Sequence, residues 1–514
     1  MSSLVRSAGI VAGSTMLSRI LGFTRDMLMA AYFGASGKTD VFFIAFRIPN
    51  LFRRFFGEGA LTISFIPVYT EYLVQKGEQE ALAVAQRTLS FLVVMLIAIV
   101  ALGEVFAPEI TSFMAQGKNN PGDLQLASEL TQIMFPYLFF VCLVAFCMGV
   151  LNSHKYFFAP AFSAVLFNAS MIVGILVLTQ YFSEPLYGVA IGVVCGGIIQ
   201  VILQIPYMIK TGFKVKIIFD WKHPGIKKII KMLLPALFGL AVYQINNVIN
   251  LILAGYLADG SISYLFYSER LTELVQGVFI VSIGNVILPE MSQMTTLKDF
   301  DRLKELYVTS IRSALFIAIP AAAALMAIGL PIIAVVFMRG EFDFNDALMT
   351  NRALFYGAAG ICSVAMLRLT TPTFFSFQDS RTPVIAATIN TVINVILGYN
   401  LMQTSLQHAG LNLALTISCT VQLLILIFLL RRKIGRLGLS KLAMPVAKNI
   451  LAAVMMVLAV VAIGGQVDWV EDAVIKKVLF LISMVVAGGA VYGLASIMLE
   501  VDEAQYIIKR LRRK

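Results

Sequence analysis

Residues 91–102 read Phe-Leu-Val-Val-Met-Leu-Ile-Ala-Ile-Val-Ala-Leu, an apolar run without a polar interruption. With its flanks it forms the segment 87–108. A helix that crosses a bilayer needs about 20 mostly apolar residues, because each residue rises about 1.5 Å. The segment therefore predicts a transmembrane helix.

The composition of the whole chain agrees with this prediction. Of the 514 residues, 59% are hydrophobic and 13% are charged, and the mean hydropathy is +0.85. A soluble domain carries about 25% charged residues. A globule this apolar could not cover its surface with polar groups, so lipid must be the solvent for much of the chain.

Fourteen segments of this kind predict an all-α polytopic membrane protein. The two long segments, 39–75 and 308–337, are expected to be kinked near Pro49 or Pro67 and near Pro320 or Pro331. The N-terminus, residues 1–34, contains three arginines and an aspartate, so we interpret it as a retained helix rather than a cleaved signal. The predicted limits are 8–33, 39–75, 87–108, 126–151, 159–181, 186–208, 229–256, 262–289, 308–337, 346–377, 383–402, 409–431, 445–464 and 475–498.

An even number of spans places both termini on one side of the membrane. If that side is the cytoplasm, the cytoplasmic segments hold 27 lysines and arginines and the outer segments hold five. This asymmetry fits the positive-inside rule and predicts cytoplasmic termini. It also explains most of the net charge of +11 without nucleic acid.

Repeated landmarks indicate an internal duplication. Arg47 and Arg270 lie 223 residues apart, and each precedes an apolar stretch that ends in a proline, Pro67 or Pro289. Two six-helix lobes around a central cavity are a transporter architecture. The predicted parts are an N-terminal lobe (1–210), a cytoplasmic amphipathic linker (211–232), a C-terminal lobe (233–432), and two extra helices with a basic tail (433–514).

Apart from the basic residues at the ends of the predicted spans, eight basic residues fall inside them, and all eight are arginines. A charge at membrane depth is costly, so such residues face a cavity or a partner. The planar guanidinium group binds phosphate or carboxylate with two hydrogen bonds, which favours an anion site. The alternative is that each arginine pairs with an internal carboxylate or reaches the membrane surface. The eight are Arg19, Arg25, Arg47, Arg53, Arg54, Arg270, Arg352 and Arg368.

A second constellation consists of amides, with Asn246 and Asn250 in one span and Asn390 and Asn394 in another. Each pair has the four-residue spacing that places two side chains on one helix face. Intramembrane amides either join helices by hydrogen bonds or coordinate a cation. The last two spans either form a groove for a lipid tail or serve packing and oligomerisation.

Signs of catalysis and of metal binding are missing from the sequence. There is no nucleotide-binding loop, no nucleophile motif and no soluble catalytic domain. The five cysteines form no Cys-x-x-Cys pair, and the three histidines are far apart, so we expect neither a disulfide framework nor a metal site. An integral-membrane enzyme acting on polyprenyl phosphate would need clustered acidic ligands, which are not seen.

Four stretches resemble the MurJ/MviN family, and the similarity extends over essentially the whole chain. The two at the N-terminus are the longest and most specific. The stretches are Thr15-Met-Leu-Ser-Arg-Ile-Leu-Gly-Phe-Thr-Arg-Asp26, Thr39-Asp-Val-Phe-Phe-Ile-Ala-Phe-Arg-Ile-Pro-Asn-Leu-Phe-Arg-Arg-Phe-Phe-Gly-Glu-Gly-Ala60, Phe266-Tyr-Ser-Glu-Arg-Leu271 and Gln378-Asp-Ser-Arg-Thr-Pro383.

The resemblance implies a fourteen-helix transporter of the MOP superfamily that moves lipid II, the undecaprenyl-pyrophosphate-linked peptidoglycan precursor. It implies alternating access, location in the bacterial inner membrane, and no enzymatic activity. It also implies that seven residues line the central cavity or its gate and that helices 13 and 14 shape a groove for the lipid tail. The seven residues are Arg19, Arg25, Arg53, Arg270, Asn50, Asp40 and Glu58.

Some members of that family have a sodium site between helices 7, 11 and 12 that uses carboxylates. The matching positions here are Asn250, Asn390 and Asn394, with Thr416 as a further ligand. A neutral amide does not compensate the charge of a cation, so drive by the membrane potential is an equal alternative to sodium coupling.

The predicted function is therefore flipping of lipid II for cell-wall synthesis, with membrane lipids and the cell-wall synthesis machinery as partners. The alternative is a MOP-type exporter of another lipid-linked oligosaccharide or of drugs. Drug export would favour acidic cavity residues, whereas this predicted cavity is rich in arginine.

Overall fold

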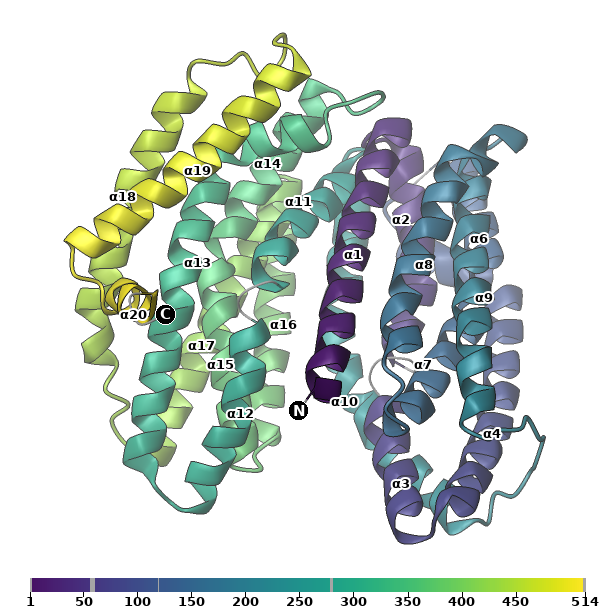
Figure 1. Ribbon diagram of the computed structural model, residues 1–514. Helices are drawn as coiled ribbons and strands as arrows, with labels where there is room; N and C mark the ends of the chain where they lie inside the picture. Colours follow the sequence, from purple (N-terminus) through teal and green to yellow (C-terminus); the bar gives the residue numbers. More distant parts are fainter. Residues whose placement is uncertain (1, 56–60, 119, 278–280, 512–514) are drawn as a thin grey trace. The chain divides into compact units, whose positions relative to one another are not determined.

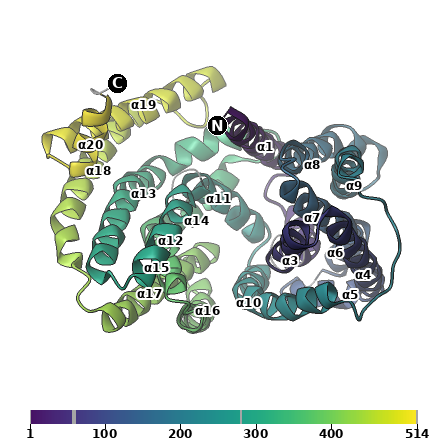
Figure 2. The ribbon, with the colours of Figure 1, turned by 60° about the horizontal axis from the view of Figure 1, so that its bottom comes forward.

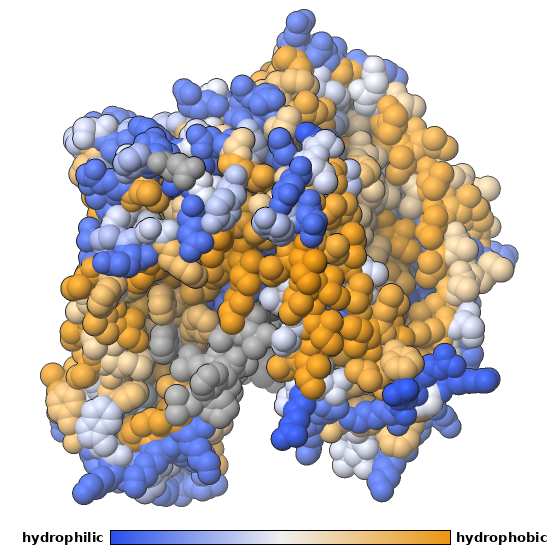
Figure 3. Space-filling view, turned by 180° about the vertical axis from the view of Figure 1, so that it is seen from behind, coloured by the Kyte–Doolittle hydropathy of each residue, from blue (hydrophilic) through white to orange (hydrophobic). Residues whose placement is uncertain are grey.

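The computed structural model describes residues 2–55, 61–118, 120–277 and 281–511, and their regular elements are all helical. Contacts between Cα atoms group the chain into two compact units, Met1–Tyr256 (unit 1) and Leu257–Lys514 (unit 2). In both units an apolar band separates two hydrophilic ends on the face shown in Figure 3. This distribution is the one expected of a chain that spans a bilayer.

The described residues of unit 1 form ten α-helices and a short 3-10 turn (Figure 1). Several helices begin at side chains that cap free backbone N–H groups, as Ser36 does for α2 and Asn120 for α6. The helices are α1 (Ser2–Phe33), α2 (Gly37–Arg53), α3 (Leu61–Gln75), α4 (Glu78–Val105), α5 (Ala107–Met114), α6 (Pro121–Met134), α7 (Tyr137–Ser153), α8 (Phe158–Leu176), η2 (Leu178–Tyr181), α9 (Leu186–Lys210) and α10 (Pro224–Gly255).

Unit 2 is built in the same way, and Asp299 and Asp343 cap α13 and α14. Its helices are α11 (Ser261–Val275), α12 (Val281–Thr296), α13 (Phe300–Val336), α14 (Phe344–Ala359), α15 (Ile361–Ser376), α16 (Arg381–Met402), α17 (His408–Ile434), η4 (Leu439–Leu442), α18 (Ala443–Gly464), α19 (Val474–Met498) and α20 (Asp502–Leu511).

Helix boundaries repeat between the units at the offset seen in the sequence. The first residues of α6 and α14 are 223 apart, and so are those of α8 and α16. The packing repeats as well, because α8 lies against α9 as α16 lies against α17, and α2 lies against α6 as α11 lies against α14. The described residues of both halves therefore follow one helical plan.

The first helices of the two repeats, α1 and α10, pack differently. Helix α1 packs along α8, whereas its counterpart α10 packs against α3 and α4 and belongs to unit 1 (Figure 2). The preceding linker is extended and lies along α4, where Ser90 Oγ accepts from the Ile218 N–H at 2.8 Å and Arg87 pairs with Asp220. The passage between the units is the short turn that follows Tyr256. The limits predicted for the lobes and the linker stay a prediction.

The predicted segment 39–75 is divided into α2 and α3, and 262–289 is divided into α11 and α12. The expected kink at Pro49 or Pro67 is wrong, because both prolines lie inside helices and the regular α-helix ends at Arg53. In the segment 308–337, by contrast, α13 has non-helical backbone angles at Ile328, three residues before Pro331. A proline removes the hydrogen bond of the preceding turn and crowds it, so this kink is confirmed.

Length and apolarity qualify nine helices as membrane spans among the described residues, or ten if α14 and α15, bent by 42°, form one span. The chain is thus a multi-span helical membrane protein, and the number fourteen stays a prediction. Helices α2, α3, α11 and α12 are too short to cross a bilayer alone and are not among these spans.

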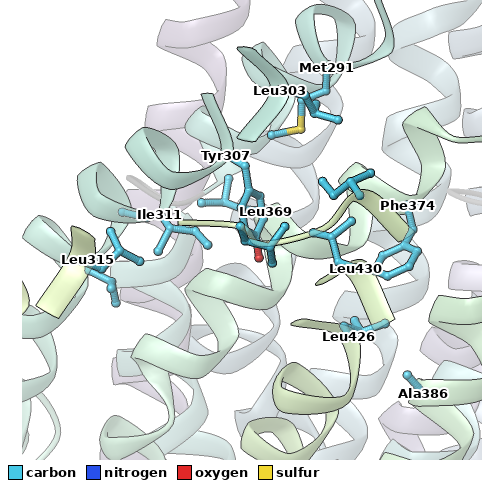
Figure 4. Close-up of a cluster of buried hydrophobic side chains, with 14 residues drawn as sticks. Met291, Leu303, Tyr307, Ile311, Leu315, Leu369, Phe374, Ala386, Leu426 and Leu430 are labelled. Carbon is cyan, nitrogen blue, oxygen red and sulfur yellow. The ribbon is translucent and has the colours of Figure 1, made fainter. Parts of the chain in front are cut away.

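The core of unit 2 lies between α12, α13, α15 and α17. Tyr307, Leu369 and Leu430 are almost completely buried in it, and the Tyr307 hydroxyl lies 2.9 Å from Thr370 Oγ1 (Figure 4). Helices α18 and α19 pack on the far side of α13, where the Tyr492 hydroxyl donates to the Phe316 carbonyl at 2.8 Å. The additional helices are therefore fixed to α13 by both apolar and polar contacts.

Candidate functional site

The side chains of Arg19 and Arg25 in helix α1 point in different directions. Ser18, Gly22 and Arg25 follow one another at four- and three-residue spacing and form a stripe that lies against Asn168 of α8. Arg19 lies off this stripe and is exposed, whereas Arg25 keeps only 9% of its surface exposed. The predicted pair is thus divided between a surface position and a buried one.

The buried guanidinium group of Arg25 is held by three neighbours. Its Nη2 lies 2.6 Å from Asp26 Oδ1, and its Nε lies 3.0 Å from the same oxygen. Its Nη1 donates to Asn168 Oδ1 at 3.0 Å and lies 3.7 Å from Met171 Sδ. This geometry matches the alternative considered for the arginines, pairing with an internal carboxylate.

Asp40 also takes part in a buried ion pair. Lys118, in the loop between α5 and α6, places its Nζ 3.1 Å from Asp40 Oδ2, and both side chains are at most 5% exposed. The same loop contacts the end of α10, because Gly117 lies against Gly255 and the Tyr256 hydroxyl donates to Gln116. The pair therefore fixes this loop to the start of α2.

The end of α2 carries three half-buried arginines, Arg47, Arg53 and Arg54. Arg53 Nε donates to Asn50 Oδ1 at 2.7 Å, one helical turn earlier. This hydrogen bond orients the guanidinium group without neutralising it, since an amide carries no charge. Glu58, the next residue of the predicted row, lies outside the described residues.

Arg270 is the predicted site residue of α11. Its Nη1 lies 2.8 Å from Glu273 Oε2, one turn later on the same helix, and its guanidinium carbon lies 4.6 Å from the centre of the Phe266 ring. The side chain of Arg270 is 32% exposed and that of Glu273 is 45% exposed. The two neighbours hold the guanidinium in place while leaving part of it accessible.

The predicted cation ligands fall in both units. Asn250 is half-buried on α10 in unit 1, whereas Asn390 and Asn394 are buried on α16 in unit 2. Thr416 Oγ1 donates to the Tyr356 carbonyl at 2.8 Å, and Asn390 Nδ2 lies 3.6 Å from Cys419 Sγ. The structure thus brings Asn390 and Asn394 onto one buried face of α16.

Acidic and sulfur ligands do not gather elsewhere, since no three His, Cys, Asp or Glu side chains of the described residues are close enough to hold a metal ion. In chemical terms, the half-buried arginines of α2 and Arg270 of α11 are equipped to bind anionic groups. The Arg25 guanidinium is more buried than these and lies among the side chains of Asp26 and Asn168.

Two residues that organise these charges were missed in the sequence. Asn168 appeared as one polar residue in an apolar span, and Lys118 was counted as a loop lysine. An available signal for Lys118 was its rarity, because few basic residues lie in the segments predicted to be outside. Nothing in the sequence pairs either residue with its partner, which is 78 positions away for Lys118 and 143 for Asn168.

The fold is similar to the folds of solved membrane transporters. It is similar to an inward-facing multidrug resistance MATE family transporter with a TM-score of 0.70, covering 82% of this chain and 95% of that one, at 16% identity. At that identity the likeness shows the fold alone. The solved structure "Lipid II flippase MurJ, inward closed conformation" has a TM-score of 0.80 at 27% identity and covers 96% of this chain and 99% of that one.

Sequence comparison identifies the family within these transporters. The family model "Lipid II flippase MurJ" matches residues 29–484. The probable lipid II flippase MurJ of Vibrio cholerae is 38% identical over 80% of this chain and 82% of its own length. The lipid II flippase MurJ of Burkholderia cenocepacia is 32% identical over 84% of both chains. The chain belongs to the MurJ family.

Proposed function

We propose that this protein moves lipid II from the cytoplasmic to the periplasmic leaflet of the bacterial inner membrane by alternating access. Family membership over most of the chain is the observation that carries the proposal. The family consists of flippases, so the protein changes the leaflet of its substrate and not its covalent structure. Peptidoglycan synthesis is the process that such transport serves.

The half-buried arginines supply the chemistry that this substrate needs. Lipid II carries a pyrophosphate, and guanidinium groups bind phosphate oxygens with paired, charge-assisted hydrogen bonds. Arg53 and Arg270 are the strongest candidates, because each is oriented by a neighbour one turn away and neither is fully buried. Arg19 is exposed on α1 and is the third candidate.

The charge asymmetry supports an orientation with both termini in the cytoplasm. The five basic residues predicted to lie outside each have a partner: Lys38 with Glu184, Lys118 with Asp40, Lys476 with Asp472, and Lys477 and Arg339 with backbone carbonyls. The basic residues of the linker and of the C-terminal tail lie on the cytoplasmic side in this orientation, facing the anionic leaflet.

Helices α18 and α19 provide the surface for the prenyl tail in this proposal. Leu458 of α18 and Leu479 and Ile482 of α19 are more than half exposed, so these helices present apolar side chains outward. In lipid such side chains need no cover. A tail lying along them stays in an apolar medium while the headgroup passes through the polar region.

Energy for transport comes from the membrane potential or from a monovalent cation at the amides of α16. The amides offer oxygen ligands but no compensating charge, which favours the potential. Transport measured in vesicles with an imposed potential, with or without sodium, distinguishes the two sources.

A variant of Arg270 tests the proposal. Purified protein in vesicles is given labelled lipid II, and its access to an impermeant reagent reports the leaflet. Arg270→Ala should slow transport at least about tenfold, because a hydrogen bond to a charged group contributes about 1.5–3 kcal/mol. Arg270→Lys should recover part of the rate, and the lipid should be chemically unchanged.

The matched control is Arg368→Ala, which removes an exposed arginine from α15 in the same unit. It should transport at the wild-type rate. Equal rates for Arg270→Ala and the wild type would remove Arg270 from the site. A wild-type protein that moves no lipid II but moves cationic drugs would favour the exporter alternative.

A further inference from the structure

The linker that precedes α10 runs beside α4 as an extended chain (Figure 1). Gln86 Nε2 donates to the Lys214 carbonyl at 2.8 Å. One helical turn later, Ser90 Oγ donates to the Lys216 carbonyl at 3.4 Å and accepts from the Ile218 N–H at 2.8 Å. A four-residue step along a helix covers about 6 Å, and a two-residue step along an extended chain covers about 6.6 Å. The match shows that the linker follows α4 with one edge of its backbone.

The side chains at every second position of this extended segment are large, apolar and exposed. Val215 is 76% exposed and Trp221 is 51% exposed, and Ile217 and Phe219 lie between these values. Residues two apart in an extended chain point to the same side. We call these four side chains the apolar stripe of the linker. Water solvates such a surface poorly, so the stripe needs an apolar partner.

The end of the stripe lies where the apolar part of α4 begins. The Trp221 ring meets the Phe91 ring edge-on, with their centres 5.0 Å apart. Phe91 is the first residue of the uninterrupted apolar run of α4, and Ser90 precedes it. Val94 and Ile97 follow Ser90 on the same helix face and are exposed apolar residues. The stripe therefore continues the surface that α4 presents to lipid, at the level where tryptophan is enriched in membrane proteins.

The surroundings of the stripe are strongly basic. Asp220 is the only acidic residue between positions 210 and 231, and it pairs with Arg87 of α4. All seven lysines of this stretch are exposed: Lys210, Lys214, Lys216, Lys222, Lys227, Lys228 and Lys231. Apolar side chains with lysines beside them are typical of segments that lie in the surface of an anionic membrane.

We propose that the apolar stripe inserts into the cytoplasmic leaflet and that the lysines beside it bind anionic phospholipid headgroups. The linker is then a membrane anchor of unit 1 that lies in the interface without crossing it. The anchor also positions α10, because His223 caps this helix and Ile226 and Ile229 of its first turns are buried. The inference goes beyond the proposed function, since these lipids are not transported, and it takes its leaflet from the proposed orientation.

Fluorescence quenching tests the insertion, because the chain has only two tryptophans, Trp221 and Trp469. The full-length Trp469→Phe variant in phospholipid vesicles makes Trp221 the single reporter. Lipids brominated at the headgroup end of their acyl chains should quench it at least about twofold, because an interfacial segment buries its apolar face about 5–10 Å deep. Lipids brominated at the methyl end should quench it clearly less.

Aqueous iodide should quench Trp221 less than it quenches free tryptophan amide. Quenching of Trp221 by iodide as strong as that of free tryptophan amide, without quenching by brominated lipid, would overturn the proposal. The stripe would then be a surface for a soluble partner. Ile217→Gln/Phe219→Gln in the same background should increase quenching by iodide. These side chains are exposed, so the helix content measured by circular dichroism should not change. Unchanged quenching by iodide would contradict insertion of the stripe.

A comparison of two brominated lipids tests the charge of the partner. At equal mole fraction, brominated phosphatidylglycerol should quench Trp221 more than brominated phosphatidylcholine, because the lysines enrich anionic lipid around it. The variant Lys214→Gln/Lys216→Gln/Lys222→Gln should lose most of this difference. The matched control removes three exposed basic residues from unit 2, Lys298→Gln/Arg302→Gln/Lys441→Gln, and should keep it. Equal quenching by both lipids with the unchanged linker would overturn the assignment of an anionic partner.

Discussion

The two units share a helical plan but differ in how deeply their described ion pairs are buried. Unit 1 contains two ion pairs whose members are all at most 11% exposed, Arg25 with Asp26 and Asp40 with Lys118. Each ion pair described within unit 2 keeps at least one side chain more than a fifth exposed, as in Arg270 with Glu273 and Lys433 with Asp379. Among the ion pairs described, the fully buried ones therefore lie in unit 1.

Burial distinguishes two kinds of ion pair. A buried pair positions the chain, whereas the members of an exposed pair can exchange partners. A buried pair has lost its hydration, so removing one partner leaves a charge that the interior stabilises poorly. A half-exposed pair is worth little, because water replaces a lost partner. Under the function proposed above, Arg270 would release Glu273 at a small cost, whereas separating Arg25 from Asp26 would cost more.

The largest effect in this comparison is expected at the Asp40–Lys118 pair. Lys118→Met should destabilise the protein by about 3–5 kcal/mol, because it removes an ion-pair partner from a fully buried carboxylate. Asp40→Asn/Lys118→Met should recover much of that loss. Chemical unfolding in detergent micelles, followed by intrinsic fluorescence, measures both variants.

Lys433→Met is the control in unit 2, and it should cost less than about 1 kcal/mol because Lys433 is 35% exposed. Equal losses for the two lysine variants would show that burial does not distinguish the units.

A smaller effect is expected at glycines that bring helices together. An added Cβ at Gly188 in unit 1 would lie 2.5 Å from the Thr179 backbone nitrogen, whereas one at Gly464 in unit 2 would meet the flexible end of Met484 at 2.7 Å. Gly188→Ala should cost about 1–3 kcal/mol, since backbone must shift. Gly464→Ala should change stability by less than about 1 kcal/mol, because Met484 can move and alanine favours the helix. The Tm values of the two variants give the comparison.

If Gly464→Ala proved the more harmful variant, the packing of α18 on α19 would be tighter than that of η2 on α9. Unit 2 would then be the more tightly packed unit at these glycines, even though its described ion pairs are the more exposed ones.

The smallest effect is a pH dependence at the rim of unit 2. Burial raises the pKa of Asp379, but hydrogen bonds from Lys433 Nζ and from the N–H and hydroxyl of Thr382 lower it more, so its pKa lies below its ordinary value. A lowered pKa contributes stability above the unfolded pKa of about 3.9, and this contribution disappears as the pH falls through the folded value.

Asp379→Asn should therefore be slightly less stable than the wild type at neutral pH, by well under 1 kcal/mol. The difference should vanish in acid. Unfolding midpoints measured from about pH 6 to pH 2 test this. A stability difference between Asp379→Asn and the wild type that grows toward low pH would contradict a lowered pKa of Asp379.

The sequence was sufficient for the features that depend on local patterns. Apolar runs of about 20 residues located the helices, since lipid exposure leaves a strong compositional signal. The offset of 223 between Arg47 and Arg270 anticipated the matched helix boundaries, because both repeats keep their landmarks in the same order. Pro331 indicated the kink in α13, but Pro49 and Pro67 did not break their helices.

Long-range pairing could not be predicted in the same way. The presence of arginines at membrane depth was evident, but whether each faces a cavity or a carboxylate depends on residues more than a hundred positions away. The structure places the Asp26 carboxylate against its neighbour Arg25, whose guanidinium group also donates to Asn168 of α8. Helix spacing cannot predict this contact, because adjacent residues normally diverge.

The short turn between α10 and α11 determines how far apart the ends of the two units can be. Because the linker before α10 is attached along α4, its thirteen residues from Thr211 to His223 supply no spare length to the connection between the units. That connection consists of residues 257–260, whose fully extended length is at most about 14 Å. Lengthening the linker would leave this tether unchanged, whereas each residue inserted after Leu257 would extend it by up to about 3.5 Å.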